Sequence, residues 1–272
     1  MTIHVPSRKQ HPLTDVQGSA DHRNVPIDKV GVCDITYPIR LRTRDGGVQH
    51  TVATVNMFVS LPHHQKGTHM SRFLEVLNDH CEEIDPTDIM AVCHDIREKL
   101  EAEDAHLELE FEYFVRKSAP KTGSPGLMNY RARFECTANH VDDFVLGVRV
   151  PATSLCPCSK EISEYGAHNQ RCEIEAKVRI DGMLWIEELV EMVESAASAQ
   201  VFAVLKRPDE KFVTEDAYDN PRFVEDIVRD LSLRLEDEPR IRWYAINSKN
   251  YESIHNHSAY AYLERDKRDA DD

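Results

Sequence analysis

The chain has 272 residues, of which 41% are hydrophobic and 30% are charged, a composition typical of a globular protein and not of a disordered tail. Its formal net charge of −15 argues against a general nucleic-acid binder, which carries a basic surface. No stretch approaches the roughly 18 to 20 apolar residues of a membrane helix, and the N-terminus lacks the apolar core of a secretory signal. We therefore expect a cytoplasmic protein with no membrane or nucleic-acid partner and with reduced thiols.

The first half of the chain predicts two strand pairs with two helices between them. Residues 1–28 are polar and form an irregular arm. Alternating apolar residues predict strands at 30–42, 48–61, 107–115 and 128–138. Helical periodicity predicts helices at 70–81 and 85–102, the second beginning at the cap-and-proline pair Asp85-Pro86.

The same element order then recurs. Strands are expected at 144–151, 171–180, 240–248 and 257–263, and helices at 184–205 and 221–235. The pattern predicts an α+β fold of antiparallel strands with helices on one face. The expected divisions are an arm (1–28), a first module (29–140), a second module (141–263) and a charged tail (264–272). Neither a dinucleotide fingerprint nor a phosphate-binding P-loop occurs.

The segment Ser154–Glu161 contains the pair Cys156 and Cys158, and His168 follows in a Gly-Ala-His-Asn-Gln-Arg run. Thiolate and imidazole groups at such spacing can bind one divalent ion. Because Cys-Pro-Cys is an awkward spacing for two ligands, we prefer one cysteine as ligand and the other as a reactive thiol. The ordinary alternative is a pair of structural cysteines in a loop.

Two further segments carry candidate chemistry. His255 and His257 lie at the head of the last expected strand, where both would face one side and could act as ligands, acid–base groups or phosphate donors. Taken alone, exposed strand-end histidines explain them slightly better. Residues 62–72 include Lys66, His69 and Arg72 immediately before a helix, a good anion site in an acidic chain. A solvated basic turn is the alternative.

Carboxylates are harder to choose among 48 acidic residues. Glu210 follows an expected helix end, and Glu225 lies in the first turns of the helix that starts at Pro221. Either could bind a metal or accept two N–H groups from a guanidine-like ring edge. The default reading of each is a surface acid. The cysteines in apolar stretches are expected to be buried small hydrophobes; they are Cys33, Cys81, Cys93, Cys136 and Cys172.

Several motifs together resemble GTP cyclohydrolase type IB, the prokaryotic GTP cyclohydrolase I family. They are DVQGSADHRNVPIDKVGV at 15–32, KGTHMSRF at 66–73, SLCPCSKEIS at 154–163, GAHNQR at 166–171 and HNHSAYA at 255–261. The resemblance covers nearly the whole chain except the tail after residue 263. It implies a tunnelling fold of two ββααββ modules, assembled as an oligomeric barrel, with a homotetramer expected and with active sites where subunits meet.

The resemblance also implies roles for individual residues. One divalent metal per site would be held by Cys156, His168 and Glu210, and Cys158 would be the catalytic thiol. Glu225 would anchor the guanine edge, while His255 and His257 would transfer protons. The triphosphate would be received by Lys66, His69 and Arg72. The family roles of Glu210 and Glu225 rest on the least distinctive local sequence, whereas those of the cysteines and histidines rest on long motifs.

The reaction implied is hydrolysis and rearrangement of GTP to formate and 7,8-dihydroneopterin triphosphate, the entry step to tetrahydrofolate. Two alternatives come from other classes: a nitrile reductase of the same fold acting on a deazapurine, and a non-catalytic protein stabilised by zinc. The mixed sulfur, nitrogen and oxygen ligand set suits Zn²⁺, Mn²⁺ and Fe²⁺ alike. The sequence leaves open whether the product feeds folate, modified tRNA nucleosides or both.

Overall fold

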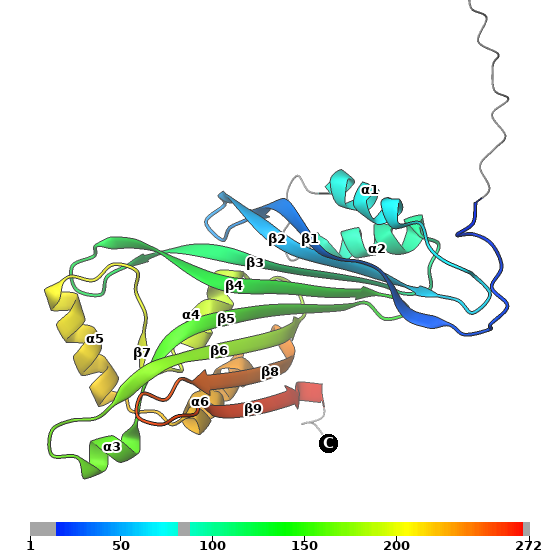
Figure 1. Ribbon diagram of the computed structural model, residues 1–272. Coiled ribbons are helices and arrows are strands. Elements are labelled where there is room, and N and C mark those ends of the chain that lie inside the picture. Colours follow the sequence, from blue (N-terminus) through cyan, green and yellow to red (C-terminus); the bar gives the residue numbers. More distant parts are fainter. Residues whose placement is uncertain (1–14, 81–87, 269–272) are drawn as a thin grey trace, which may run out of the picture.

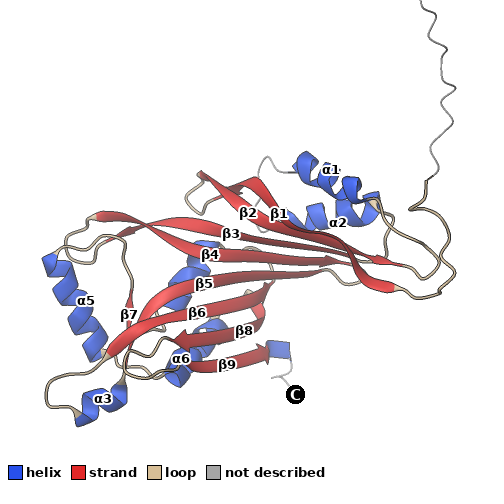
Figure 2. Cartoon of the chain, viewed as in Figure 1, coloured by secondary structure: helices blue, strands red, loops and turns tan. Residues whose placement is uncertain are grey.

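The computed structural model describes residues 15–80 and 88–268, and its strands form one antiparallel sheet (Figures 1 and 2). The sheet order is β1-β2-β3-β4-β5-β6-β8-β9, with the short β7 beside β5. The strands are β1 (Ile27–Arg42), β2 (Val48–Leu61), β3 (Ala105–Ser118), β4 (Pro125–Ala138), β5 (Asp143–Leu155), β6 (Asn169–Ile180), β7 (Ala199–Gln200), β8 (Ile241–Asn250) and β9 (Ala259–Asp266). The expected module boundary near residue 140 falls in the turn between β4 and β5, and the division itself stays a prediction.

The helices are α1 (Met70–His80), α2 (Ile89–Lys99), α3 (Pro157–Ile162), α4 (Ile186–Glu194), α5 (Arg207–Asp219) and α6 (Val224–Asp237). Four of them, α1, α2, α4 and α6, cover one face of this sheet, and α3 and α5 lie at one end of it (Figure 1). Alternate strand residues such as Leu107 and Phe111 are buried in one apolar cluster with Phe73 of α1, Leu189 of α4 and Leu231 of α6. Each fully buried side chain of this size contributes about 1.5–3 kcal/mol, so the shared cluster holds both halves together.

The other face of the sheet is charged. Glu135 of β4 accepts from Lys177 Nζ of β6 at 2.8 Å, and Arg179 Nε contacts Asp143 Oδ1 at 2.6 Å. The strict alternation of apolar and charged residues therefore places the helices on one side only, as the sequence predicts.

The α+β prediction is confirmed in most of its elements. The strand expected at 48–61 has the bounds of β2, and α1 is described over Met70–His80 of the helix expected at 70–81. The start expected for the second helix, at residue 85, lies outside the described residues, and α2 is described from Ile89. Residues 264–266 belong to β9 instead of a tail.

The helix predicted over 184–205 is confirmed over α4 (Ile186–Glu194) but is wrong beyond residue 194. There Ala199 and Gln200 form β7, in which Ala199 pairs with Thr153 of β5. The α5 helix was missed, and Glu210 lies in its first turn instead of after a helix end. Only Asp209 and Ala217 of α5 are buried, so this helix has no apolar periodicity to predict it.

Candidate functional site

The connection between β5 and β6 carries the two candidate thiols. Cys156 is the N-cap of α3, and its Sγ accepts a hydrogen bond from the Ser159 N–H at 3.5 Å. Pro157 occupies the first helical turn, where its missing N–H costs nothing. Cys158 is exposed one residue further on. The local structure thus separates a half-buried thiol from an exposed one, in agreement with unequal roles.

Cys156 and His168 face each other at the end of this hairpin. The Cys156 N–H donates to the His168 carbonyl at 3.1 Å, just beyond the last strand pair, Leu155 and Asn169. The His168 N–H in turn donates to Ser159 Oγ at 3.2 Å. These bonds close the loop on itself and bring the two predicted ligands together.

The imidazole of His168 joins this hairpin to the loop between β8 and β9. Its Nδ1 lies 3.0 Å from Gln170 Oε1 and 3.1 Å from Ser253 Oγ. The Tyr251 N–H donates to the Arg171 carbonyl at 2.9 Å, which ties the same loop to β6. His168 Nε2 has no hydrogen-bond partner within residues 15–80 and 88–268, so it remains available as a ligand atom.

His255 and His257 lie in that β8–β9 loop. Both are exposed, and their rings stack with centroids 5.1 Å apart and planes 15° apart. The expectation that a strand aligns them is wrong, because β9 begins only at Ala259. The same loop nevertheless holds both imidazoles side by side, and it contacts the His168 ring through Ser253.

The start of α6 is anchored to the end of β5. The Arg222 N–H donates to the Leu155 carbonyl at 3.1 Å, and Ser154 Oγ donates to the Arg222 carbonyl at 3.0 Å. Asn250 Nδ2 of β8 donates to Ser154 Oγ at 3.0 Å. Glu225, exposed in the first turn of α6, is therefore held near the thiol loop. Sequence reasoning missed Ser154 and Asn250, because a lone Ser or Asn inside a strand carries no signal.

Glu210 is a predicted metal ligand that the fold does not place beside Cys156 and His168. It is exposed in the first turn of α5, whereas the other end of α5 contacts the thiol loop through Lys160 Nζ, which donates to the Tyr218 carbonyl. Within the described part of the chain, no three His, Cys, Asp or Glu side chains form a group that could hold a metal ion. The sulfur and imidazole donors of Cys156 and His168 do suit such an ion.

The candidate phosphate-binding residues lie elsewhere. The loop between β2 and α1 is at the opposite end of the molecule from α3 (Figure 1). Lys66 in this loop is exposed and, within the described ranges, has no side-chain partner. His69 Nε2 lies 3.3 Å from Asp15 Oδ2, and Arg72 Nη1 donates to the Lys99 carbonyl at 3.2 Å. One protomer therefore does not unite the two sets of predicted residues.

The described part of the N-terminal arm packs on this basic loop. Ala20 forms a bridge with Gln65, and the Lys66 N–H donates to the Ser19 carbonyl at 3.0 Å. The hydrogen bond from the Gly18 N–H is the main reason that the pKa of Asp15 lies below its usual value, with His69 contributing further. The arm thus supplies a carboxylate that already occupies one side of the His69 ring.

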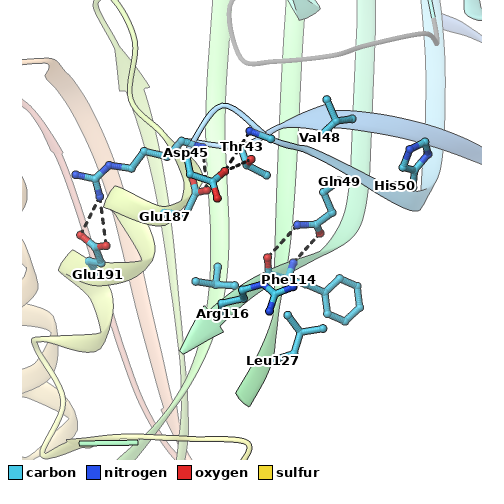
Figure 3. Close-up of a pocket in the computed structure, with 13 residues that line it drawn as sticks. Thr43, Asp45, Val48, Gln49, His50, Phe114, Arg116, Leu127, Glu187 and Glu191 are labelled. Carbon is cyan, nitrogen blue, oxygen red and sulfur yellow. Dashed lines mark hydrogen bonds and ion pairs between the residues drawn. The ribbon is translucent and has the colours of Figure 1, made fainter. Parts of the chain in front are cut away.

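A hollow of about 850 Å³ lies away from all of these motifs, between the β1–β2 turn, β3 and α4 (Figure 3). The Gln49 side chain fills the gap between the strands there, donating to the Phe114 carbonyl at 2.9 Å and accepting from its N–H at 2.8 Å. Arg44 pairs with Glu191 at 3.3 Å. None of the predicted site residues lines this hollow, so its size does not make it the reaction site.

The remaining cysteines separate by burial. Desolvation raises the pKa of Cys93 and of Cys172 to about 12, which keeps both as inert thiols, and Cys136 is shifted in the same direction for the same reason. Cys33 is exposed, so the prediction that it is buried is wrong. It lies in the register shift between Val32 and Ile35 of β1, an edge strand. Cys81 lies outside the described residues.

Comparison with known proteins gives a consistent family. A family model described as type I GTP cyclohydrolase folE2 matches residues 13–261. A GTP cyclohydrolase FolE2 of Geobacter sulfurreducens is 54% identical over 258 residues, covering 95% of this chain and 100% of its own. The FolE2 proteins of Geotalea uraniireducens and Methylococcus capsulatus are 53% and 54% identical and cover 94% and 95% of this chain and 95% and 97% of their own.

Solved structures match the fold at low sequence identity. Urate oxidase from Bacillus subtilis has a TM-score of 0.52 at 7% identity, covering 89% of this chain and 99% of its own. A urate oxidase mutant from Bacillus sp. TB-90 has a TM-score of 0.51 at 11% identity, with the same coverage. These neighbours support the tunnelling-fold class expected from the sequence. No helix among the described residues is long and apolar enough to cross a membrane.

Proposed function

The chain belongs to the type I GTP cyclohydrolase folE2 family, and we propose that its active site joins the thiol loop of one subunit to the β2–α1 loop of another. The enzyme is a GTP cyclohydrolase of folate biosynthesis. The observation that supports this site is the backbone hydrogen bond between Cys156 and His168, which holds the two residues opposite each other at the hairpin end. The loop that contains His255 and His257 lies beside them and contacts the His168 ring through Ser253. The family match favours this reaction over the nitrile reductase and the zinc-stabilised binding protein.

Cys156 Sγ and His168 Nε2 would hold one divalent ion, Zn²⁺, Mn²⁺ or Fe²⁺, with Glu210 as the third ligand. The fit rests on donor chemistry and on the free Nε2, since Nδ1 of the same ring is already engaged by Gln170 and Ser253. Such an ion supplies Lewis-acid activation of water for hydrolysis. Glu210 enters through the resemblance, and its exposed position on α5 leaves its carboxylate unencumbered.

The protein's own groups then bind the substrate and move protons. The Glu225 carboxylate accepts the two N–H groups at the 2-amino and N1 positions of guanine, a donor pair that adenine lacks. The exposed Cys158 thiol exchanges a proton with the opening imidazole ring, and His255 and His257 carry protons during the later ring closure. The stacking of the two imidazoles places both side chains together in the β8–β9 loop.

The triphosphate is received by Lys66, His69 and Arg72 of a neighbouring subunit. The β2–α1 loop and the start of α1, which carry these residues, lie at the opposite end of the protomer from α3 (Figure 1), so a site within one subunit would lack them. The thiol end is bordered by exposed acids, among them Glu161, Glu164 and Glu215. Their charge complements the basic β2–α1 loop, which favours a homo-oligomer, a tetramer built as a barrel.

An anaerobic assay of the purified protein tests this proposal. GTP turnover is followed by formate release and by pterin fluorescence after oxidation and dephosphorylation, before and after EDTA and with Zn²⁺ or Mn²⁺ restored. We expect both products, lost on chelation and recovered with metal, while circular dichroism shows that the fold persists. Loss of the fold on chelation would assign the metal a structural role. Turnover that EDTA leaves intact would contradict the metal site.

A further inference from the structure

Gln170, the second residue of β6, is a buried polar side chain with only 7% of its surface exposed. Its Oε1 lies 3.0 Å from His168 Nδ1, and its Nε2 lies 3.5 Å from Glu252 Oε1. The amide thus stands between an imidazole and a half-buried carboxylate from the β8–β9 loop. A buried amide with both ends engaged can impose a direction on its neighbours.

The chemistry of the three groups allows one orientation. The Glu252 carboxylate is acceptor-only when ionised, so it draws the NH₂ end of Gln170 toward itself. The carbonyl end of Gln170 must then face His168. A carbonyl oxygen accepts only, so His168 Nδ1 carries the hydrogen and donates it. The Nε2 atom of His168 is left with its lone pair exposed.

We propose that Gln170 and Glu252 are positioning residues that hold His168 in the tautomer whose Nε2 binds the metal. The inference rests on the proposed function, in which His168 is a ligand. Imidazole ligands are generally oriented in this way by an acceptor on their second ring nitrogen, and removal of that acceptor lowers metal affinity by about 10- to 100-fold. The carboxylate sets the direction, and the buried amide transmits it.

The same contacts give the β8–β9 loop a fixed place. Glu252 and Ser253 are neighbours, and Ser253 Oγ lies 3.1 Å from the same His168 Nδ1. The imidazole of His168 is therefore held by β6 on one side and by this loop on the other. The loop also carries His255 and His257, so the orientation of the metal ligand and the placement of the proton-transfer groups depend on shared contacts.

The test measures metal affinity of the chelator-stripped, full-length protein, with Zn²⁺ and Mn²⁺ as probes and a competing chromogenic chelator as indicator. The variants are Gln170→Leu, Glu252→Gln, the exchange Gln170→Glu/Glu252→Gln, and His168→Ala. Gln49→Leu is the matched control, because Gln49 also joins two segments through its amide but lies far from the thiol loop. Thermal unfolding monitors the fold of each variant.

We expect Gln170→Leu to weaken binding of both ions by about 10- to 100-fold, with Gln49→Leu unchanged. The exchange variant keeps an acceptor toward His168 and a donor from position 252, so its affinity should lie within about twofold of wild type. If Gln170→Leu fails to fold, the exchange variant and Glu252→Gln decide the matter.

Wild-type affinity in Gln170→Leu, together with lost binding in His168→Ala, would overturn the positioning role while leaving the metal site intact. Wild-type affinity in His168→Ala would instead refute the proposed ligand set. An exchange variant as weak as Gln170→Leu would contradict the inferred direction of the hydrogen bonds.

Discussion

The two halves of the sheet share one element order apart from α3, β7 and α5 of the second half, but their connections carry different chemistry. β1 and β2 are joined by a tight turn at residues 43–47, whereas the equivalent link between β5 and β6 is thirteen residues long and holds Cys156, Cys158 and His168. The β3–β4 turn has no histidine, while the β8–β9 loop has His255 and His257. The core elements match, and the site lies in loops at the strand ends.

The helices and their entrances differ in a complementary way. The first turn of α2 has no acidic residue, whereas the corresponding turn of α6 contains Glu225. Conversely, the β2–α1 loop is basic and contains Lys66, while the β6–α4 link is short. Each half thus supplies what the other lacks. This division explains why a single subunit carries all the predicted groups and still does not unite them.

The exposed thiols give the strongest test of the difference between the halves, because each half has one among the described residues: Cys33 in the first and Cys158 in the second. Cys158→Ala should lower kcat by about 10²- to 10⁴-fold, because a positioned proton-transfer group is lost. Cys33→Ala should leave kcat unchanged. The measurement is steady-state GTP turnover with metal content determined in parallel. Equal activity of the two variants would remove Cys158 from the mechanism.

The acidic first turn of α6 is the next contrast. Glu225→Ala should raise KM for GTP by about 10- to 100-fold, since a hydrogen bond to a charged group contributes about 1.5–3 kcal/mol. Discrimination against ATP should relax at the same time. Glu98→Ala, which removes an exposed acid of α2 in the other half, is the control. Unchanged kinetics in Glu225→Ala would assign the guanine edge to another residue.

Mixing two inactive variants tests whether the halves cooperate between subunits. Lys66→Ala and Cys158→Ala are damaged in different halves, so co-expressed, differently tagged copies should form hybrid oligomers. If each site takes one half from each of two subunits, roughly a quarter of the sites are fully wild type, and activity returns to that level. Hybrids that stay inactive, with their mixed composition verified by both tags, would place the site within one chain.

A smaller effect, on thermal stability, is expected from the contact between α5 and the β3–β4 turn, which joins the two halves. Asp209 of α5 is fully buried and accepts from the Lys121 N–H at 2.8 Å and the Thr122 N–H at 2.9 Å, both in the β3–β4 turn. Burial opposes its ionisation, but these bonds and those from Thr122 Oγ1 and the Lys206 N–H outweigh it and hold its pKa below the ordinary 3.8.

A carboxylate whose pKa is lowered in the folded state stabilises the protein above its unfolded pKa, and this contribution is lost as pH falls through the folded value. Asp209→Asn should therefore lower Tm by a few degrees at pH 7, with a gap from wild type that narrows below pH 3.8. Asp219→Asn at the far end of α5 serves as control. A Tm difference between wild type and Asp209→Asn that stays constant below pH 3.8 would contradict a stabilising role of the Asp209 charge.

Local patterns in the sequence predict much of this architecture. Alternation over 48–61 and helical spacing over 70–81 reproduce β2 and α1 because both elements bury one regular face. The pattern is silent for α5, of which only Asp209 and Ala217 are buried. It misleads after Glu194, where Ala199 belongs to a short strand instead of a helix.

The sequence by itself predicted the α+β fold class, indicated the family and supplied the candidate reactive side chains, because these depend on residue type and short-range spacing. The tertiary structure decided how those side chains are held. It aligned Cys156 with His168 through a backbone hydrogen bond. It also placed Ser253 against the His168 ring and Glu252 against Gln170, since the pairing of β6 with β8 brings together residues that are 85 and 82 positions apart in the chain. It also put Lys66 at the far end of the protomer, a separation that no local pattern encodes.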